Sequence, residues 1–234
     1  MRHNDPEVVA REYASEQGLL GRRAAYRFAE GPDPREIVFR AVAEVEPRRV
    51  LEVGPGPGEL AERIRDELEA DVVAVDSSPR MVELTRGRGI EAMVGDVQEL
   101  PFEDESFDCA VAAWMLYHVP DVDRGIAELA RVLRPGGRLV AATNAADHWD
   151  GLRELLTDER ADMCFSAANG EELLSRAFAR VERIDATGWI VFPSRTEAQE
   201  FADATMTLSG ELPQFEGPLR VRRSPYVFVA EKSS

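Results

Sequence analysis

Three glycines in the first third of the chain stand at a spacing that suits a ligand-binding turn. The segment LEVGPGPGELAERI, residues 51–64, puts Gly54, Gly56 and Gly58 directly after a strand-like run and directly before a helix-like one. Glycine permits positive φ and close approach of the backbone to a ligand, and the two intervening prolines stiffen the loop. A tight turn also needs glycine for its own geometry, so this feature alone leaves both interpretations open.

Acidic residues follow the next two strand-like runs. The run VVAVDSS contains Asp76, 22 positions after Gly54, where an acid can accept hydrogen bonds from both hydroxyls of a ribose. The alternative is that Asp76 caps the helix that begins near residues 77–79. Further on, GDVQELPFEDESFD puts Asp96 and the backbone of Val97 at another strand end, suited to an adenine edge. Turn and acid together predict an adenosine-type ligand, without separating a nicotinamide dinucleotide from other nucleosides.

The best candidate for a general base is His118, which follows the fourth strand-like run in WMLYHVPD. An unperturbed histidine pKa of about 6.5 suits proton removal near neutrality. The alternative is a histidine that orders the turn before Pro120 or merely contacts the ligand. Tyr117, His148 and Trp149 are candidates to line a second pocket, although packing or surface exposure explains each of them more simply.

The elements that must position these residues alternate between apolar runs rich in Val and Ala and segments of helical period. This pattern is typical of a parallel sheet covered on both faces, so the sequence predicts a doubly wound α/β fold. We expect strands at residues 49–53, 71–75, 91–95, 107–112 and 138–143, and helices near 58–69, 78–86 and 121–133.

The two ends of the chain do not continue this alternation of apolar runs and segments of helical period. The segment NGEELLSRAF predicts a helix capped by Asn169, with Glu172 in the capping-box position. Two longer strands are expected at 181–192 and 219–231, joined by a segment with a helix at 196–206 that lets the second strand return antiparallel beside the first. Helices at 5–17 and 34–46 precede the first strand, and the segment between them is a candidate cover for the site.

Composition narrows the class of protein. The chain has 234 residues, 44% of them hydrophobic, which predicts a single packed domain. A net charge of −16 disfavours nucleic acids and anionic membranes as partners, although a local basic patch at Arg220, Arg222 and Arg223 stays open. Cys109 and Cys164 indicate free thiols of a reducing compartment, not a disulfide or a metal site. With no signal-peptide-like or membrane-spanning apolar run, we expect a cytoplasmic protein.

Five motifs in fixed order resemble the class I S-adenosylmethionine-dependent methyltransferases, in particular the small-molecule, methyltransferase-11-like type. They are LEVGPGPG, the pattern D-x-S-x-x-M at residues 76–81, GDVQELPF, FDCAVAAWMLYHVPD and LRPGG, all between Arg48 and Thr143. The resemblance is specific for fold and cofactor but not for the acceptor. It implies a Rossmann-like seven-stranded sheet of order 3-2-1-4-5-7-6 with strand 7 antiparallel. Residues 1–47 would then form a helical cover, 48–143 the cofactor-binding core, and 144–234 strands 6 and 7 with the acceptor pocket.

The resemblance also implies roles for residues at matching positions. Glu52 and the backbone of Gly54, Gly56 and Gly58 would hold the methionine part of S-adenosylmethionine, and Asp76 the ribose hydroxyls. Ser77 and Met81 would lie beside the adenosine, Asp96 and Val97 would contact adenine, the backbone of Ala113 would receive the amino group, and Tyr26 or Tyr13 would close over the cofactor. Family members often carry aspartate where Glu52 stands.

The predicted activity is therefore transfer of a methyl group to O, N or C of a small-molecule acceptor that the sequence does not identify, with S-adenosylhomocysteine as the other product. Alignment of the reacting atoms can contribute about 7–11 kcal/mol, and a base such as His118 matters only for a hydroxyl or protonated amine. A nicotinamide-dependent oxidoreductase is disfavoured by the G-x-G-x-G spacing and by GDVQELPF. A non-catalytic S-adenosylmethionine-binding protein stays open, as does the choice between monomer and homodimer.

Overall fold

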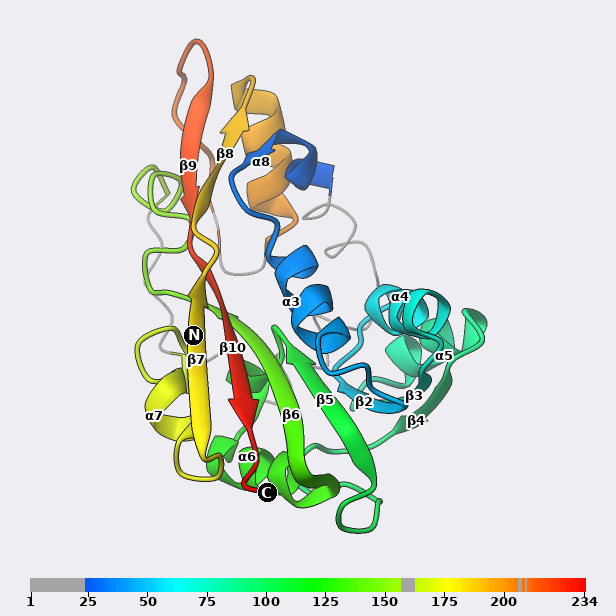
Figure 1. The fold of residues 1–234 in the computed structure, drawn as a ribbon. Coiled ribbons are helices and arrows are strands. Elements are labelled where there is room, and N and C mark those ends of the chain that lie inside the picture. Colours follow the sequence, from blue (N-terminus) through cyan, green and yellow to red (C-terminus); the bar gives the residue numbers. More distant parts are fainter. Residues whose placement is uncertain (1–23, 157–162, 206–207, 209) are drawn as a thin grey trace.

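A seven-stranded mixed sheet dominates the computed structural model, which describes residues 24–156, 163–205, 208 and 210–234 (Figure 1). Its strands are β2 (Arg49–Val53), β3 (Asp71–Asp76), β4 (Glu91–Val94), β5 (Phe107–Ala113), β6 (Leu133–Asn144), β7 (Arg180–Asp185) and β10 (Pro225–Glu231). Their order is β4-β3-β2-β5-β6-β10-β7, and β10 runs antiparallel to both of its neighbours. The predicted order 3-2-1-4-5-7-6 with an antiparallel strand 7 is confirmed.

Helices cover both faces of this sheet because alternate strand residues point to opposite sides. On one face, α3 (Pro34–Ala43), α4 (Glu59–Leu68) and α5 (Pro79–Gly87) pack over side chains such as Val50. On the other face, α6 (Val122–Val132) and α7 (Gly170–Leu174) pack over Leu51 and Val53. The doubly wound α/β fold expected from the sequence is therefore confirmed.

Side chains define where two of these helices begin. The hydroxyl of Ser78 accepts from the N–H of Met81 at 3.4 Å at the start of α5, and Asp121 accepts from the N–H of Arg124 at 3.0 Å at the start of α6. Asp76 is thus not the cap of α5, because Ser78 takes that position. The predicted helix at 34–46 is α3, whereas the one predicted at 5–17 lies outside the described residues.

The capping box predicted for the helix after Asn169 is wrong. Asn169 is the N-cap residue of α7, as predicted, but its side chain forms no cap hydrogen bond, and the helix has only five residues. The amide of Asn169 accepts from the N–H of Ser166 at 2.7 Å and donates to the carbonyl of Cys164 at 2.9 Å. Glu172 forms an ion pair with Arg176 at 2.9 Å instead of reaching back to the helix start. The side chains that fit the capping pattern are used by the preceding loop and by the helix surface.

Both of the long late strands predicted from the sequence are interrupted, so the prediction of two continuous strands is wrong. The first splits into β7 and β8 (Gly188–Phe192), and the second into β9 (Leu219–Arg223) and β10. Strands β8 and β9 join β1 (Ala29–Glu30) in a second, antiparallel sheet of order β1-β8-β9. Figure 1 shows this pair rising beyond the large sheet as an extension of β7 and β10.

A third apolar cluster fills the space between the second sheet and α8 (Arg195–Asp203), the helix predicted at 196–206. Its fully buried members include Ile190, Phe192 and Val221 from the strands. The second sheet therefore has a core of its own, which packs beside the end of the large sheet.

Within the described ranges, no helix combines the length and the apolar character that crossing a membrane requires.

Candidate functional site

The three glycines of the turn between β2 and α4 have different roles. All of them have positive φ, which is +64° at Gly54, +57° at Gly56 and +79° at Gly58. A Cβ atom on Gly54 would lie 2.7 Å from Cβ of Met115, and one on Gly58 would lie 2.8 Å from Oγ1 of Thr85. A Cβ atom on Gly56 would meet nothing within 4 Å. Gly54 and Gly58 are therefore needed for packing of the turn, and Gly56 is the position where its backbone borders open space.

Neighbouring elements hold this turn in place. The N–H of Gly54 donates to the carbonyl of Val75 at 2.8 Å, and the hydroxyl of Thr85 donates to the carbonyl of Gly56 at 3.0 Å. Arg88 Nε donates to the carbonyl of Pro57 at 2.7 Å. The loop is thus bound to β3 and α5 before any ligand arrives, which lowers the entropy lost on binding.

Glu52 brings an unsatisfied carboxyl group to the same place. It lies on β2, is 3% exposed, and its Oε2 atom has no hydrogen-bond partner. Burial, with a smaller contribution from the charge of Asp76, raises the pKa of Glu52 to about 8. A buried polar atom without a partner is rare in folded proteins, and a ligand that forms a hydrogen bond there removes the cost.

Asp76 ends the neighbouring strand β3. Its Oδ1 accepts from the N–H of Ser78 at 2.8 Å, and burial raises the pKa of Asp76 to about 6 against the opposing effect of the Ser78 and Gly56 amides. Ser77 is exposed beside it, whereas Met81 is fully buried in α5. The two carboxyl groups, Glu52 and Asp76, thus stand on adjacent parallel strands and are close enough to affect each other electrostatically.

The remaining predicted cofactor residues follow the ends of β4 and β5. Asp96 is exposed and accepts from the backbone and side-chain nitrogens of Gln98 at 2.9 and 2.8 Å, while the side chain of Val97 is buried in the core. Ala113 is the last residue of β5, and the next residue, Trp114, has a φ of 57°. Since β4, β3, β2 and β5 are adjacent parallel strands, these residues occupy one edge of the sheet.

His118 lies just past the same edge, in the 3-10 turn Leu116–His118. Its ring stacks edge-on against Tyr117 with 4.4 Å between the ring centres, and both side chains are half-buried. The Sγ atom of Cys164 lies 3.4 Å from the carbonyl oxygens of both Tyr117 and Val119, so the segment after residue 162 holds this turn. In the part of the chain that the structure describes, no three His, Cys, Asp or Glu side chains are grouped so as to hold a metal ion.

The other aromatic and histidine candidates lie at the second sheet. His148 is buried, its Nδ1 accepts from the N–H of Ser224 at 2.9 Å, and burial together with the charges of Arg153 and Arg223 lowers the pKa of His148 to about 3. Trp149 belongs to the third apolar cluster, as the simpler interpretation predicts. Tyr26 lies in a 3-10 turn that packs on β8, its ring 4.8 Å from the Arg35 guanidinium; Tyr13 lies outside the described residues.

Arg223 lies in a different environment from the two other arginines of β9. The sequence leaves open a basic surface patch of Arg220, Arg222 and Arg223, yet Arg223 is 1% exposed and is among the largest fully buried side chains. The signal was present in LRVRR, because a strand with period two puts Arg223 on the same face as the buried Val221.

Comparison with known proteins identifies the family that part of this chain resembles. Residues 51–141 match the family model described as a methyltransferase domain. This part of the chain, less than half of its length, is thus similar to a methyltransferase domain. An uncharacterized methyltransferase of Mycobacterium tuberculosis is 43% identical over 111 residues, 46% of this chain and 45% of that protein. A demethylmenaquinone methyltransferase of Renibacterium salmoninarum is 36% identical over 126 residues, 53% of each protein. The matches thus span about half the length of these curated relatives.

Solved structures share the fold of residues 51–141 and their surroundings. The YcgJ protein of Bacillus subtilis has a TM-score of 0.62 at 18% identity, covering 85% of this chain and 99% of that one. Phosphoethanolamine N-methyltransferase 2 of Haemonchus contortus, solved with phosphomonomethylethanolamine and S-adenosylhomocysteine, has a TM-score of 0.68 at 17% identity, covering 100% of this chain and 61% of that one. At these identities the likeness concerns the fold alone.

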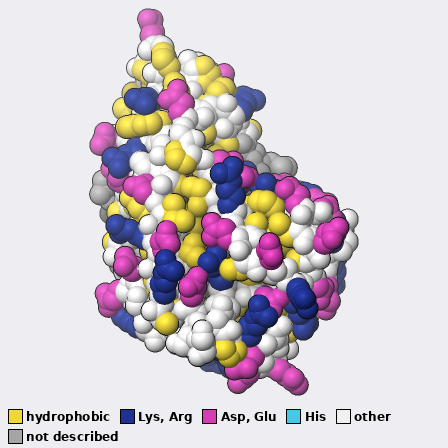
Figure 2. All heavy atoms as spheres, in the orientation of Figure 1, with side chains coloured by type: hydrophobic (Ala, Val, Ile, Leu, Met, Phe, Trp, Pro, Cys, Tyr) yellow, Lys and Arg dark blue, Asp and Glu magenta, His cyan; other side chains and the backbone are white. Residues whose placement is uncertain are grey.

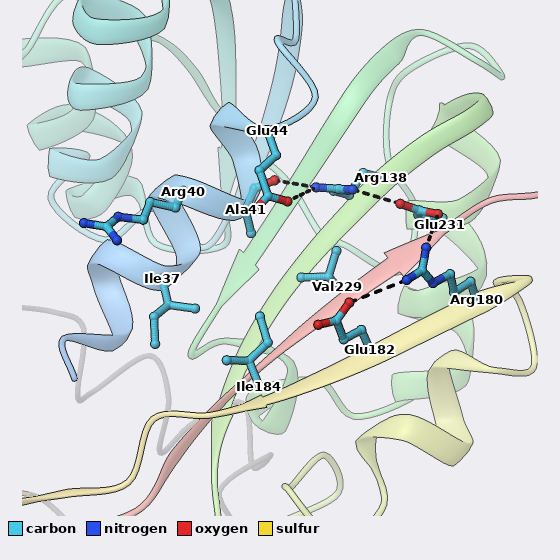
Figure 3. A pocket seen from close by; sticks show the side chains of 10 residues that line it. All are labelled: Ile37, Arg40, Ala41, Glu44, Arg138, Arg180, Glu182, Ile184, Val229 and Glu231. Carbon is cyan, nitrogen blue, oxygen red and sulfur yellow. Dashed lines mark hydrogen bonds and ion pairs between the residues drawn. The ribbon is translucent and has the colours of Figure 1, made fainter. Parts of the chain in front are cut away.

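A groove of about 430 Å³ lies elsewhere on the molecule, between α3 and strands β6, β10 and β7 (Figure 3). Figure 2 shows hydrophobic side chains in the middle of this face with acidic and basic side chains around them. Arg138 forms ion pairs with Glu44 at 3.0 Å and with Glu231 at 2.8 Å there. Since Arg138 pairs with Cys109 near the start of β5, the groove lies away from the carboxyl edge, where ligands of such sheets bind.

Proposed function

We propose that this chain is an S-adenosylmethionine-dependent methyltransferase that transfers a methyl group to O, N or C of a small-molecule acceptor. The observation that carries the proposal is the turn at Gly56, where the backbone borders open space next to the buried, unpartnered Oε2 of Glu52. The similarity of residues 51–141 to a methyltransferase domain supports it. Residues 144–234 would complete a single domain with the core and supply the acceptor pocket.

The residues at the carboxyl edge fit this cofactor. Oε2 of Glu52 is an acceptor without a donor, which suits the amino group of the methionine part, and Gly56 leaves room for that part beside the backbone. Asp76 has a carboxyl group for two ribose hydroxyls. The remaining proposed contacts are Gly54, Gly58, Ser77, Met81, Asp96, Val97 and the backbone of Ala113, with Tyr26 or Tyr13 as the cover.

The chain's own contribution to the reaction is mainly alignment. The cofactor supplies a methyl group on a sulfonium, which already carries its leaving group. Holding the acceptor atom in line with that methyl group can lower the barrier by about 7–11 kcal/mol. For a hydroxyl or ammonium acceptor, His118 is the proposed base: its half-buried ring lies just past the end of β5 and would take the proton as the acceptor attacks.

Thermal unfolding with S-adenosylmethionine, S-adenosylhomocysteine and NAD in parallel tests the cofactor. At about 100 times its dissociation constant, a ligand adds about 2.7 kcal/mol to stability and raises the midpoint by about 5–10 °C. We expect both sulfur-containing ligands to raise the midpoint and NAD to leave it unchanged. A rise with NAD alone would overturn the proposal in favour of an oxidoreductase.

A second measurement separates an enzyme from a non-catalytic binding protein. S-adenosylhomocysteine release is followed by mass spectrometry while small hydroxyl, amine and activated-carbon acceptors are offered one at a time. Acceptor-dependent release, with the acceptor gaining the mass of one methylene group, is the expected result. Binding of the cofactor without release for any acceptor would favour the non-catalytic alternative.

A further inference from the structure

Arg223 ends β9 and points to the buried face of the second sheet. It pairs with Gly188 of β8, and its guanidinium lies over that glycine, because a Cβ atom on Gly188 would stand 2.8 Å from Nη2. The absence of a side chain at position 188 thus makes room for the guanidinium. Only 1% of Arg223 is exposed.

One nitrogen of this guanidinium is satisfied and two are not. Nη2 donates to the carbonyls of Pro32 at 2.5 Å and Glu30 at 3.3 Å, both in the connection between β1 and α3. Nε and Nη1 are buried and have no hydrogen-bond partner. Among the described residues no carboxylate forms an ion pair with Arg223; Asp33 and Tyr26 act on it only at longer range.

The two other arginines on β9 are exposed and form ion pairs with carboxylates, as arginines at a protein surface usually do. The side chain of Arg222 is 44% exposed and pairs with Asp147 at 3.1 Å, and that of Arg220 is 56% exposed and pairs with Glu30 at 3.6 Å. Both occupy the opposite face of the strand. A buried guanidinium keeps its charge and is costly unless an anion meets it, so Arg223 is the member of this set that is arranged for an external partner.

Arg223 also lies near the carboxyl edge of the large sheet, the edge of the proposed cofactor site. The carbonyl of the next residue, Ser224, accepts from the N–H of Ala145 at 2.8 Å, and Pro225 pairs with Asn144, the last residue of β6. Oδ1 of Asn144 is itself buried without a partner. Strand β6 is the neighbour of β5, whose carboxyl end carries Ala113 of the proposed cofactor site. The unsatisfied atoms of Arg223 therefore lie beyond the strand ends, where an acceptor would be held.

We propose that Arg223 binds an oxyanion on the methyl acceptor, so that the substrates of this enzyme are carboxylates or phosphate monoesters. The inference rests on the proposed function and specifies its substrate class. Nε and Nη1 are the nitrogens left to donate a charge-assisted hydrogen bond, since Nη2 is held by the carbonyls of Pro32 and Glu30. Their N–H groups point to different sides of the guanidinium plane, so the oxyanion accepts from one of them. The acceptor atom is elsewhere on the substrate, since the oxyanion serves for recognition only.

Binding is measured first, by thermal unfolding of the protein saturated with S-adenosylhomocysteine. Benzoate and inorganic phosphate are the two anionic probes and benzamide is the neutral one. At about ten times the dissociation constant we expect one of the anions to raise the midpoint by about 3–6 °C and benzamide to have no effect. Which anion stabilises the protein distinguishes a carboxylate from a phosphate substrate.

Two variants assign the effect to this side chain. Arg223→Met is expected to lose the anion-dependent shift, while the matched control Arg222→Gln on the same strand keeps it. Arg223→Lys keeps a cation if the Met variant does not fold, and retains less than half of the shift because an ammonium is a more strongly hydrated point charge than a guanidinium. The proposal is overturned if neither anion raises the midpoint of the wild type. It is also overturned if the anion stabilises Arg223→Met as much as it stabilises the control Arg222→Gln. If Arg223→Met does not fold, the same comparison is made with Arg223→Lys.

Activity provides an independent arm. For each acceptor found by release of S-adenosylhomocysteine, kcat/KM is compared between the acid and its neutral amide. Arg223→Met should lower kcat/KM about 10–100-fold for the acid and leave the amide unchanged. Equal losses for both would mean that Arg223 only supports the fold. In all of these experiments, the rise in midpoint caused by S-adenosylhomocysteine alone tests the proposed function. A failure of the proposed function is therefore distinguished from a failure of the Arg223 proposal.

Discussion

The N–H of Ser224 donates to Nδ1 of His148 across 2.9 Å at the junction between β9 and β10. This hydrogen bond, with the one from Ala145 to the carbonyl of Ser224, takes both backbone polar groups of Ser224 out of the strand ladder. The second sheet leaves the first at this residue. A histidine that the sequence offers as a pocket candidate therefore acts as a neutral hydrogen-bond acceptor inside the fold.

Removing that acceptor should destabilise the protein. In His148→Ala the buried N–H of Ser224 loses its partner and the contact with Trp149 is lost, so we expect a cost of about 2–4 kcal/mol in urea unfolding. His148→Asn keeps an acceptor near the Nδ1 position and should cost less than half as much. Equal costs for the two variants would mean that the hydrogen bond contributes little.

Glu52 should make folding stability fall as the pH rises. Burial raises its pKa from 4.5 to about 8, so between these values the folded protein holds a proton that the unfolded chain has released. Stability from this group is fully present below pH 4.5, decreases as the pH rises towards 8, and is absent above it. The decrease is of the order of a few kcal/mol.

Glu52→Gln is the test of this prediction, because the amide has the same shape and no titration. We expect the variant to lose most of the decline in midpoint between about pH 6 and pH 9, as measured by thermal unfolding without ligand, and to be the more stable protein at the upper end. His148 contributes a separate change at lower pH, since its pKa is lowered to about 3 and stability from it falls as the pH drops below 6.5. A decline of the same size in the Gln variant over the alkaline range would contradict the assignment.

Gly56 should be the glycine of the turn whose side chain affects binding most cleanly. In Gly56→Leu the side chain enters the open space, so affinity for S-adenosylhomocysteine should fall at least about 100-fold, while the positive φ costs about 1–2 kcal/mol of stability. Gly217→Leu is a matched control, because Gly217 also has a positive φ and no neighbour within 4 Å of a Cβ atom. Unchanged affinity in Gly56→Leu, measured by calorimetry, would remove the main support for the cofactor site.

Gly54→Ala should behave in the opposite way. Its Cβ atom would lie 2.7 Å from Cβ of Met115, an overlap that the backbone must relieve. We expect about 1–3 kcal/mol more loss of stability than in Gly56→Ala, seen in urea unfolding. Similar stabilities for the two alanine variants would show that the turn adapts easily.

His118→Gln should lower kcat about 10²–10⁴-fold for a hydroxyl or ammonium acceptor, with little change in the dissociation constant of S-adenosylhomocysteine. Tyr117→Phe removes a hydroxyl from the stacked neighbour and serves as the control. A kcat within about twofold of the wild type would leave His118 with the role of ordering the turn.

The cofactor-binding half could be predicted closely because its signals are local. Strand β2 occupies residues 49–53 as expected, and α6 occupies 122–132 against an expected 121–133. Strand β6 begins at Leu133, earlier than expected, because Leu133 pairs with Phe107 across a register shift that no local pattern reveals. Periodicity reports which face of an element is buried, whereas pairing between distant segments adds or removes residues at its ends.

The sequence by itself determined the doubly wound α/β class, the turn at Gly54–Gly58 and the strand-end positions of Glu52, Asp76 and Asp96, since these follow from motif order and alternation, while the order of the sheet was implied by the resemblance that the same motifs carry. Only the tertiary structure decided that Gly56 borders open space, that β7 and β10 stop where the second sheet begins, and that Arg223 is buried. Arg223 meets Glu30 and Pro32, which are 193 and 191 residues away in the chain. Burial of a side chain depends on segments that the fold brings together, so residue type and local spacing do not specify it.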